Sequence, residues 1–153
     1  MGQINEFKRK NMKIEINCSQ ELLEKSKYCG TGLGGVKHDV VSKCWIALAV
    51  QEVFPNSQVN NHIKIIFEGG KLYLKDLVLD LPVYAKGMIR DFDACDRYGM
   101  TPEQTAELRL EKLNPFTFEI ELTEEQENIL LENISLPDLT ECFVKSKHLT
   151  LTV

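Results

Sequence analysis

The sequence lacks several features that would place it in a well-known class of protein. Its five cysteines are an odd number without any Cys-x-x-Cys pair, which excludes the disulfide framework that small secreted domains use. Its three histidines are far apart and have no metal-ligand spacing, so we expect no metal and no other cofactor. Nucleophile motifs such as Gly-x-Ser-x-Gly are absent too. Catalysis stays an open question, and a protein that is not an enzyme is favoured.

Long apolar runs and a secretion signal are also missing. No segment approaches the roughly 20 apolar residues that a membrane-spanning helix needs, and the first residues contain no apolar core of a signal peptide. We therefore expect a cytoplasmic protein that does not bind membranes. Unpaired cysteines fit a reducing compartment. Cys44 and Cys142 lie among apolar neighbours, where a thiol usually behaves as a small buried hydrophobe.

The proportion of charged residues is ordinary, and the net charge is negative. Charged residues make up 27 % of the chain and the net charge is −5, so nucleic acid is not an expected partner. The distribution is uneven, because a basic start is followed later by residues 103–132, where nine glutamates stand against Arg109 and Lys112. Such an acidic surface favours a protein partner, with a solvated helix face as the plainer interpretation. These features do not predict the oligomeric state.

The remaining composition is typical of one globular domain. A chain of 153 residues with 43 % hydrophobic residues can bury a core without disulfides or metals. We expect a single domain over residues 1–153, with the basic residues 1–11 as a frayed end. Strands and helices mix without regular β-α-β alternation. This order predicts an α+β fold with a mainly antiparallel sheet and a central β-hairpin, packed against about four to five helices.

Several short segments alternate or concentrate apolar side chains as strands do. They span residues 13–17, 63–67, 72–74, 77–81, 116–122 and 149–153. Gly69 and Gly70 separate the second and third segments and predict a tight turn, which makes this pair the central hairpin. The segment 116–122 has one acidic face. Its expected inward residues are Phe116, Phe118, Ile120 and Leu122.

Five segments have the periodicity and the boundary residues of helices. They span residues 20–27, 40–54, 83–94, 101–113 and 123–134. Ser19 is the expected N-cap of the first, and Thr101 and Thr123 begin capping boxes for the last two. The segment 40–54 is the most apolar and is expected to be one central helix with Asp39 as its N-cap. In the segment 83–94, the residues expected on or near one face are Val83, Met88, Ile89 and Phe92.

A glycine-rich stretch is the candidate binding site for a small molecule. It comprises Gly30, Gly32, Gly34, Gly35, Lys37 and His38. Three of the glycines match Gly-x-Gly-x-x-Gly, and the lysine and histidine would help backbone N–H groups to hold a phosphate or carboxylate near a helix start. A dinucleotide fold needs a buried strand before the first glycine, whereas residues 24–29 are mostly polar. A plain connector is therefore the competing interpretation.

An acidic cluster resembles a calcium loop only in part. Asp91, Asp93 and Asp96 form the cluster, and Asp91 with Asp93 gives the Asp-x-Asp start of such a loop. An EF-hand also needs a glycine at its sixth position and a glutamate at its twelfth, where this chain has Asp96 and Pro102. We therefore expect solvated carboxylates near the end of a helix, with nearby arginines as partners.

Three segments occur in an informative order. They are Cys-Trp-Ile-Ala-Leu-Ala from Cys44, Ile-Arg-Asp-Phe-Asp-Ala from Ile89, and Pro-Phe-Thr-Phe-Glu from Pro115. Together they resemble a group of small uncharacterised bacteriophage and prophage proteins, in which similar segments form a helix, a second helix and a strand. The likeness covers about residues 39–122. This chain has tryptophan where that group has proline, and a longer link before the third segment. The resemblance implies a phage or mobile-element origin and carries no known activity.

Two functions are predicted from these observations. The leading hypothesis is a non-enzymatic interaction protein, encoded by a phage or mobile element, that binds a macromolecular partner through an acidic surface or a sheet edge. It expects the two acidic helices, at 101–113 and 123–134, to share one exposed face. The alternative is a binder of an anionic small molecule or nucleotide, or a nucleotide-processing enzyme, that uses the loop from Gly30 to Gly35. This alternative requires a pocket at that loop.

Overall fold

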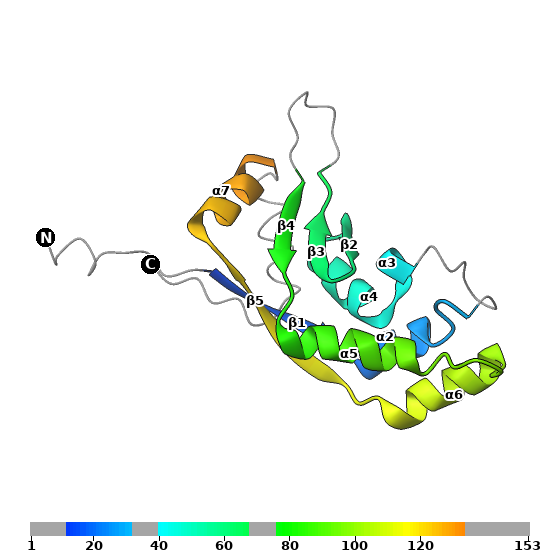
Figure 1. Cartoon of the computed structure of the whole chain (residues 1–153). Helices are drawn as coiled ribbons and strands as arrows, with labels where there is room; N and C mark the ends of the chain where they lie inside the picture. Colours follow the sequence, from blue (N-terminus) through cyan, green and yellow to red (C-terminus); the bar gives the residue numbers. More distant parts are fainter. Residues whose placement is uncertain (1–11, 32–39, 68–75, 134–153) are drawn as a thin grey trace, which may run out of the picture.

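The computed structural model describes residues 12–31, 40–67 and 76–133 (Figure 1). These residues form six helices and five strands, and the strands belong to two antiparallel sheets. The predicted α+β class with antiparallel strands is thus confirmed. Within the same residues, no helix combines the length and the apolar character needed to cross a bilayer.

The first sheet is a two-stranded ribbon made from segments far apart in the sequence. It pairs β1 (Met12–Cys18) with β5 (Phe116–Leu122), in a register that runs from Met12 opposite Leu122 to Cys18 opposite Phe116. Alternate side chains of both strands are buried, as their sequence pattern predicts. Three of the four expected inward residues of β5 are buried, and Phe116 is half-buried.

The second sheet has three strands in the order β2, β3, β4. They are β2 (Ser57–Val59), β3 (His62–Ile65) and β4 (Leu77–Asp80). β3 corresponds to the first predicted strand of the hairpin, and its antiparallel partner is β4. The predicted glycine turn and the strand at 72–74 lie outside the described residues. β2 was not predicted, because three residues are too few to display a periodic pattern.

The single helix predicted over residues 40–54 is wrong. The structure contains two helices, α3 (Val40–Lys43) and α4 (Trp45–Gln51), and between them Cys44 is extended, with φ −71° and ψ 166°. The break coincides with a long-range contact, since the buried Trp45 indole donates from Nε1 to the carbonyl oxygen of Ser19 at 2.9 Å. Tertiary packing therefore overrides the local helical periodicity. The expected N-cap at residue 39 lies outside the described residues.

The other four helices agree with their predicted positions. They are α2 (Gln20–Ser26), α5 (Val83–Ala94), α6 (Pro102–Lys112) and α7 (Glu124–Asn133). The Ser19 side chain accepts a hydrogen bond from the backbone of Leu22, which confirms the predicted N-cap of α2. Reciprocal hydrogen bonds confirm both capping boxes, Thr101 with Gln104 and Thr123 with Gln126.

One prediction for α5 is wrong. Val83 was expected on or near the inward face, yet its side chain is 85 % exposed. The buried face of α5 runs through Ala85, Ile89 and Phe92, which are spaced four and three residues apart. Val83 lies away from this stripe, at the first position of the helix.

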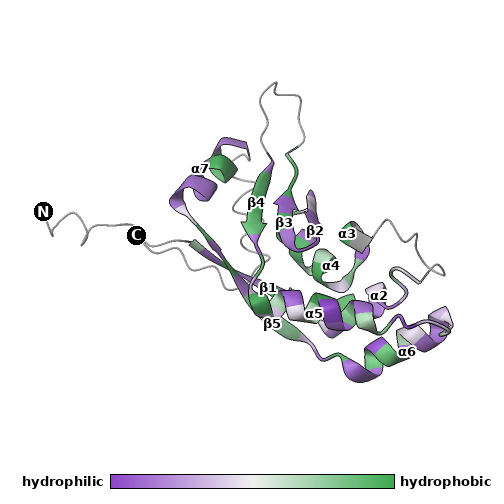
Figure 2. Cartoon of the chain, in the orientation of Figure 1, coloured by the Kyte–Doolittle hydropathy of each residue, from purple (hydrophilic) through white to green (hydrophobic). Residues whose placement is uncertain are grey.

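α4 occupies the space between the two sheets. It contacts both β1 and β2, and α2 packs beside it. A single hydrophobic cluster includes Trp45 and Ile46 of α4, Ile14 of β1 and Ile63 of β3. Figure 2 shows the corresponding hydrophobic colouring on α4 and β4 and a mixed colouring on α5 and α6.

α7 covers the edge of β4 that faces away from β3. It contacts both β4 and β5, and Gln126 donates from Nε2 to the carbonyl oxygen of Val78 at 3.3 Å. An uncovered strand edge offers unpaired backbone groups to other chains. Gln126 of α7 occupies one such group of β4, the carbonyl oxygen of Val78.

Candidate functional site

The predicted glycine-rich site lies almost entirely outside the described residues. Those not described are Gly32, Gly34, Gly35, Lys37 and His38. Gly30 is described, and its φ of 77° lies in the left-handed region that favours glycine. Thr31 closes a tight turn there, since its Oγ1 donates to the carbonyl oxygen of Tyr28 at 2.7 Å. The anion site at this loop stays a prediction.

A buried arginine fixes the turn that leads into this loop. Arg109 of α6 is 2 % exposed, and its Nη1 donates to the carbonyl oxygens of Lys27 at 2.9 Å and Cys29 at 2.7 Å. Its Nε donates to the carbonyl oxygen of Phe92 at 3.1 Å, and the guanidinium carbon lies 3.7 Å from the centroid of the Phe92 ring. One cation therefore satisfies carbonyl groups at the C-terminal ends of α2 and α5.

The burial of this arginine was not predicted, although its spacing on α6 is consistent with an inward position. Thr105 and Ala106 are buried on α6, and Arg109 follows them at the spacing of one helical face. Burial lowers the pKa of the Arg109 guanidinium, while nearby thiols and carboxylates, including Asp93, oppose that shift. Conversely, partial burial raises the pKa of the Asp93 carboxyl, and Arg109 opposes it. The arrangement anchors three segments and offers no reactive group.

The acidic cluster of α5 does not converge. Asp91 and Asp96 are exposed, and so is Asp93, although its carboxyl is partly desolvated. Asp96 accepts a hydrogen bond from Thr105 Oγ1 at 3.5 Å. Throughout the described ranges, no three histidine, cysteine or acidic side chains come together as a metal site would require.

The described cysteines are buried free thiols: Cys18, Cys29, Cys44 and Cys95. The prediction of a buried hydrophobe is thus confirmed for Cys44, while Cys142 lies outside the described residues. Burial raises the pKa of the Cys44 thiol to about 12, and it raises the pKa of Cys18 as well. Because the thiolate is the nucleophile, neither sulfur is prepared for covalent chemistry.

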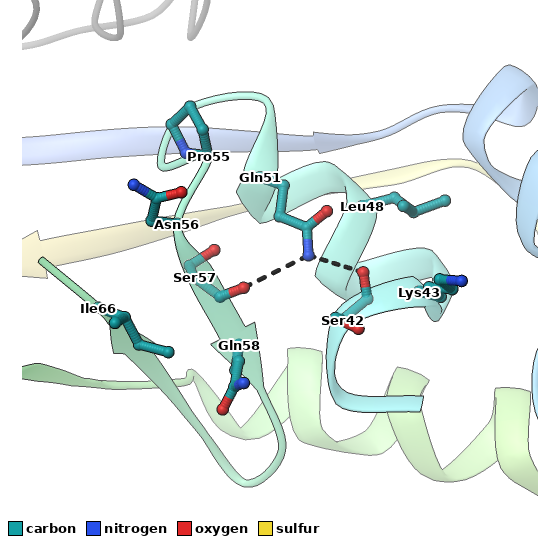
Figure 3. A pocket seen from close by; sticks show the side chains of 9 residues that line it. All are labelled: Ser42, Lys43, Leu48, Gln51, Pro55, Asn56, Ser57, Gln58 and Ile66. Carbon is teal, nitrogen blue, oxygen red and sulfur yellow. Dashed lines mark hydrogen bonds between the residues drawn. The ribbon is translucent and has the colours of Figure 1, made fainter. Parts of the chain in front are cut away.

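A pocket of about 430 Å³ lies where α3 and α4 meet β2 (Figure 3). Its polar lining residues are Ser42, Lys43, Gln51, Asn56, Ser57 and Gln58. Its apolar lining residues are Leu48, Pro55 and Ile66. The pocket was not predicted, because the strand that forms one of its walls was not recognised in the sequence.

Gln51 holds the pocket together at its centre. Its Nε2 donates to the carbonyl oxygen of Ser42 at 2.7 Å and to that of Ser57 at 3.3 Å. These two bonds join α3 to β2, as the dashed lines in Figure 3 show. Ser57 Oγ is buried and has no hydrogen-bond partner, and it is the one such side-chain atom in the described part of the chain.

The outward side of the β1–β5 ribbon is acidic. Glu119 stands directly opposite Glu15, and Glu121 stands opposite Lys13. The exposed Glu124 and Glu125 follow in the first turn of α7. We refer to Glu15, Glu119, Glu121, Glu124 and Glu125 as the acidic ribbon face.

The two acidic helices do not form the common face that the sequence led us to expect. α6 precedes β5 and α7 follows it, so the helices lie at opposite ends of that strand (Figure 1). The glutamates of α6 are consequently remote from those of α7. The glutamates of β5 and those of the first turn of α7 remain close along the chain, because α7 begins two residues after β5 ends.

Comparisons with known proteins identify no relative. No protein-family model matches the chain, and neither a curated protein nor a solved structure matches it significantly. The function has to be inferred from the residues themselves.

Proposed function

We propose that this protein is a non-enzymatic interaction protein that binds a macromolecular partner, namely a basic surface of another protein, through the acidic ribbon face. A phage or mobile-element origin, implied by the resemblance of its sequence segments, belongs to the same proposal. Within the described residues, the buried thiols and the scattered aspartates support binding in preference to catalysis.

One observation carries the proposal, namely the pairing of Glu15 with Glu119. Side chains directly opposite each other in an antiparallel pair have Cβ atoms about 5 Å apart, and like charges at that spacing destabilise the sheet. A basic residue at either position would stabilise it. Proteins often retain residues that cost stability where function requires them. A partner that brings positive charge to this face would meet two neighbouring carboxylates at this position.

The charge around this pair fits a basic partner. The acidic ribbon face contains five carboxylates, and Lys13 is the basic residue that stands across from one of them. Complementary charge mainly raises the association rate and selects the partner, and its effect decreases as salt screens it. Binding is therefore expected to weaken with ionic strength.

The test is affinity capture from host lysate with three forms of the protein. The first is the wild type, the second carries Glu119→Gln and Glu121→Gln on β5, and the third carries Glu107→Gln and Glu111→Gln on α6. The second and third lose the same charge from exposed positions. We expect a basic partner to be retained by the wild type and the α6 variant and to be lost with the β5 variant.

A follow-up titration of the captured protein by calorimetry gives the affinity of each form. The β5 variant should bind at least about tenfold more weakly at low salt, since two charged contacts are removed. Equal affinities of the β5 and α6 variants would refute the proposal, as would a partner whose binding does not depend on salt.

A further inference from the structure

The pocket at α3, α4 and β2 has the size of a small-molecule site. Its volume of about 430 Å³ lies within the range of roughly 300–1,000 Å³ that is usual for such sites. It is lined by several side-chain amides and hydroxyls together with the apolar side chains of Leu48, Pro55 and Ile66. Six of the nine lining residues are polar, so the lining is more polar than is usual for a small-molecule site and favours a polar ligand.

Gln51 is preorganised to accept a hydrogen bond. An amide has two N–H donors, and the two carbonyl oxygens of Ser42 and Ser57 occupy Nε2. This arrangement fixes the orientation of the amide and leaves Oε1 as the acceptor. A ligand that donates an N–H to Oε1 does not have to pay the entropy of ordering this side chain.

The lining contains one formal positive charge, which is compatible with an anionic ligand. Lys43 is the one lining residue that carries a formal charge, in a chain whose net charge is −5. The neighbouring Ser57 contributes an unusual feature, because its buried Oγ has no partner. An unsatisfied buried hydroxyl costs free energy, and such groups in native proteins call for an explanation.

We propose that this pocket binds a mononucleotide-sized organic anion, with nucleoside monophosphates as the chemical class. Lys43 pairs with the phosphate, Gln51 Oε1 accepts an N–H from the base, and the apolar wall contacts the body of the ligand. This proposed site differs from the nucleotide site predicted from the sequence, which was the glycine-rich loop. The inference is independent of the acidic ribbon face, which is built from other elements.

The test is a titration of the full chain followed by backbone amide NMR. The probes are adenosine 5′-monophosphate, adenosine and inorganic phosphate. We expect the monophosphate to shift the amide signals of Ser57 and Gln58 in a saturable way, adenosine to shift them with lower affinity, and phosphate to bind more weakly than either.

Two variants and one control separate the contacts. Lys43→Gln should weaken the monophosphate about tenfold and leave adenosine unchanged, because only the phosphate contact is lost. Gln51→Met should weaken both by about fivefold. Lys86→Gln changes the same charge at an exposed position on α5 and should have no effect.

Three results would overturn the proposal. The first is the absence of saturable shifts at Ser57 and Gln58 with the monophosphate at millimolar concentration. The second is an equal loss of affinity in the Lys43 and Lys86 variants, which would indicate nonspecific charge attraction. The third is retention of wild-type affinity in a folded Gln51→Met variant. None of these outcomes depends on whether a basic partner binds the acidic ribbon face.

Discussion

At the scale of single residues, Arg109 connects α6 to the C-terminal ends of α2 and α5 through hydrogen bonds. Its guanidinium reaches carbonyl groups that belong to three separate residues, and lysine has no fork that could span them. We expect Arg109→Lys to lower the free energy of unfolding by about 3 kcal/mol, because hydrogen bonds to a charged group contribute about 1.5–3 kcal/mol each. Urea denaturation measures the loss.

Arg97→Lys is the matched control for this prediction. Arg97 is exposed and makes one hydrogen bond, from Nε to the carbonyl oxygen of Ala94 at 3.4 Å. The same replacement there should change the unfolding free energy by less than about 0.5 kcal/mol. Similar losses in the two variants would show that Arg109 does not anchor the helix ends.

The buried thiols predict how stability depends on pH. Burial raises the folded-state pKa of Cys18 and Cys44, to about 12 for Cys44, whereas an unfolded thiol titrates near about 8.5. Above that lower value the unfolded chain releases protons that the folded protein retains, so stability decreases as pH rises. The expected slope is about 1.4 kcal/mol per pH unit for each thiol, up to the folded pKa.

The measurement compares urea unfolding of the reduced wild type and a Cys18→Ala, Cys44→Ala variant at pH 7.5 and pH 10. Other groups titrate in this range, so the difference between the two proteins isolates the thiols. The variant should lose less stability on going to pH 10. Parallel losses in both proteins would contradict the assigned pKa shifts.

At the scale of elements, the register of the β1–β5 ribbon predicts that two similar substitutions change the free energy of unfolding in opposite directions. Glu119→Lys places a cation across from Glu15, while Glu121→Lys places one across from Lys13. The first should raise the free energy of unfolding by about 0.5 kcal/mol and the second should lower it by about the same amount. Both variants change the net charge equally, so each serves as the control for the other.

Thermal and urea unfolding at low salt measure both changes, and added salt should reduce the difference between them. Effects of the same sign would mean that net charge, and not the pairing of individual residues, sets the stability of the ribbon.

The elements that could be predicted are those with strong local signals. Capping residues at Ser19, Thr101 and Thr123 marked three helix starts, because the caps act within one turn of the chain. β2 has three residues and gave no pattern, and the break at Cys44 depends on a contact between Trp45 and a residue of another segment. Long-range contacts of this kind are not encoded in local periodicity.

The same reasoning explains why the candidate sites were predicted unevenly. The alternating pattern of residues 116–122 predicted one acidic face of β5. The structure shows in addition that Glu119 stands opposite Glu15. The pocket could not be predicted, since Gln51 and Ser57 come together only when β2 packs against α4. The burial of Arg109 was not predicted, and its carbonyl partners lie in α5 and beyond α2, where no local pattern of α6 indicates them.

At the scale of the whole molecule, the hydrophobic cluster joins both sheets through α4, which predicts one cooperative unit. Trp45 reports on the contact between α4 and the rest of the core, and it is the one tryptophan of the chain. Ile63 lies in β3, in the other sheet, and is fully buried. We expect Ile63→Val to destabilise the protein by about 1 kcal/mol.

If the two sheets unfold together, the unfolding midpoint measured by Trp45 fluorescence moves down by roughly 2–4 °C in the Ile63→Val variant, as does the midpoint measured by far-UV circular dichroism. The core residues link the sheets without an intervening polar layer, because α4 is buried against both β1 and β2. A fluorescence midpoint that stays at the wild-type value while the dichroism midpoint falls would show two units that unfold separately. In that case the acidic ribbon face and the pocket at β2 would belong to different folding units.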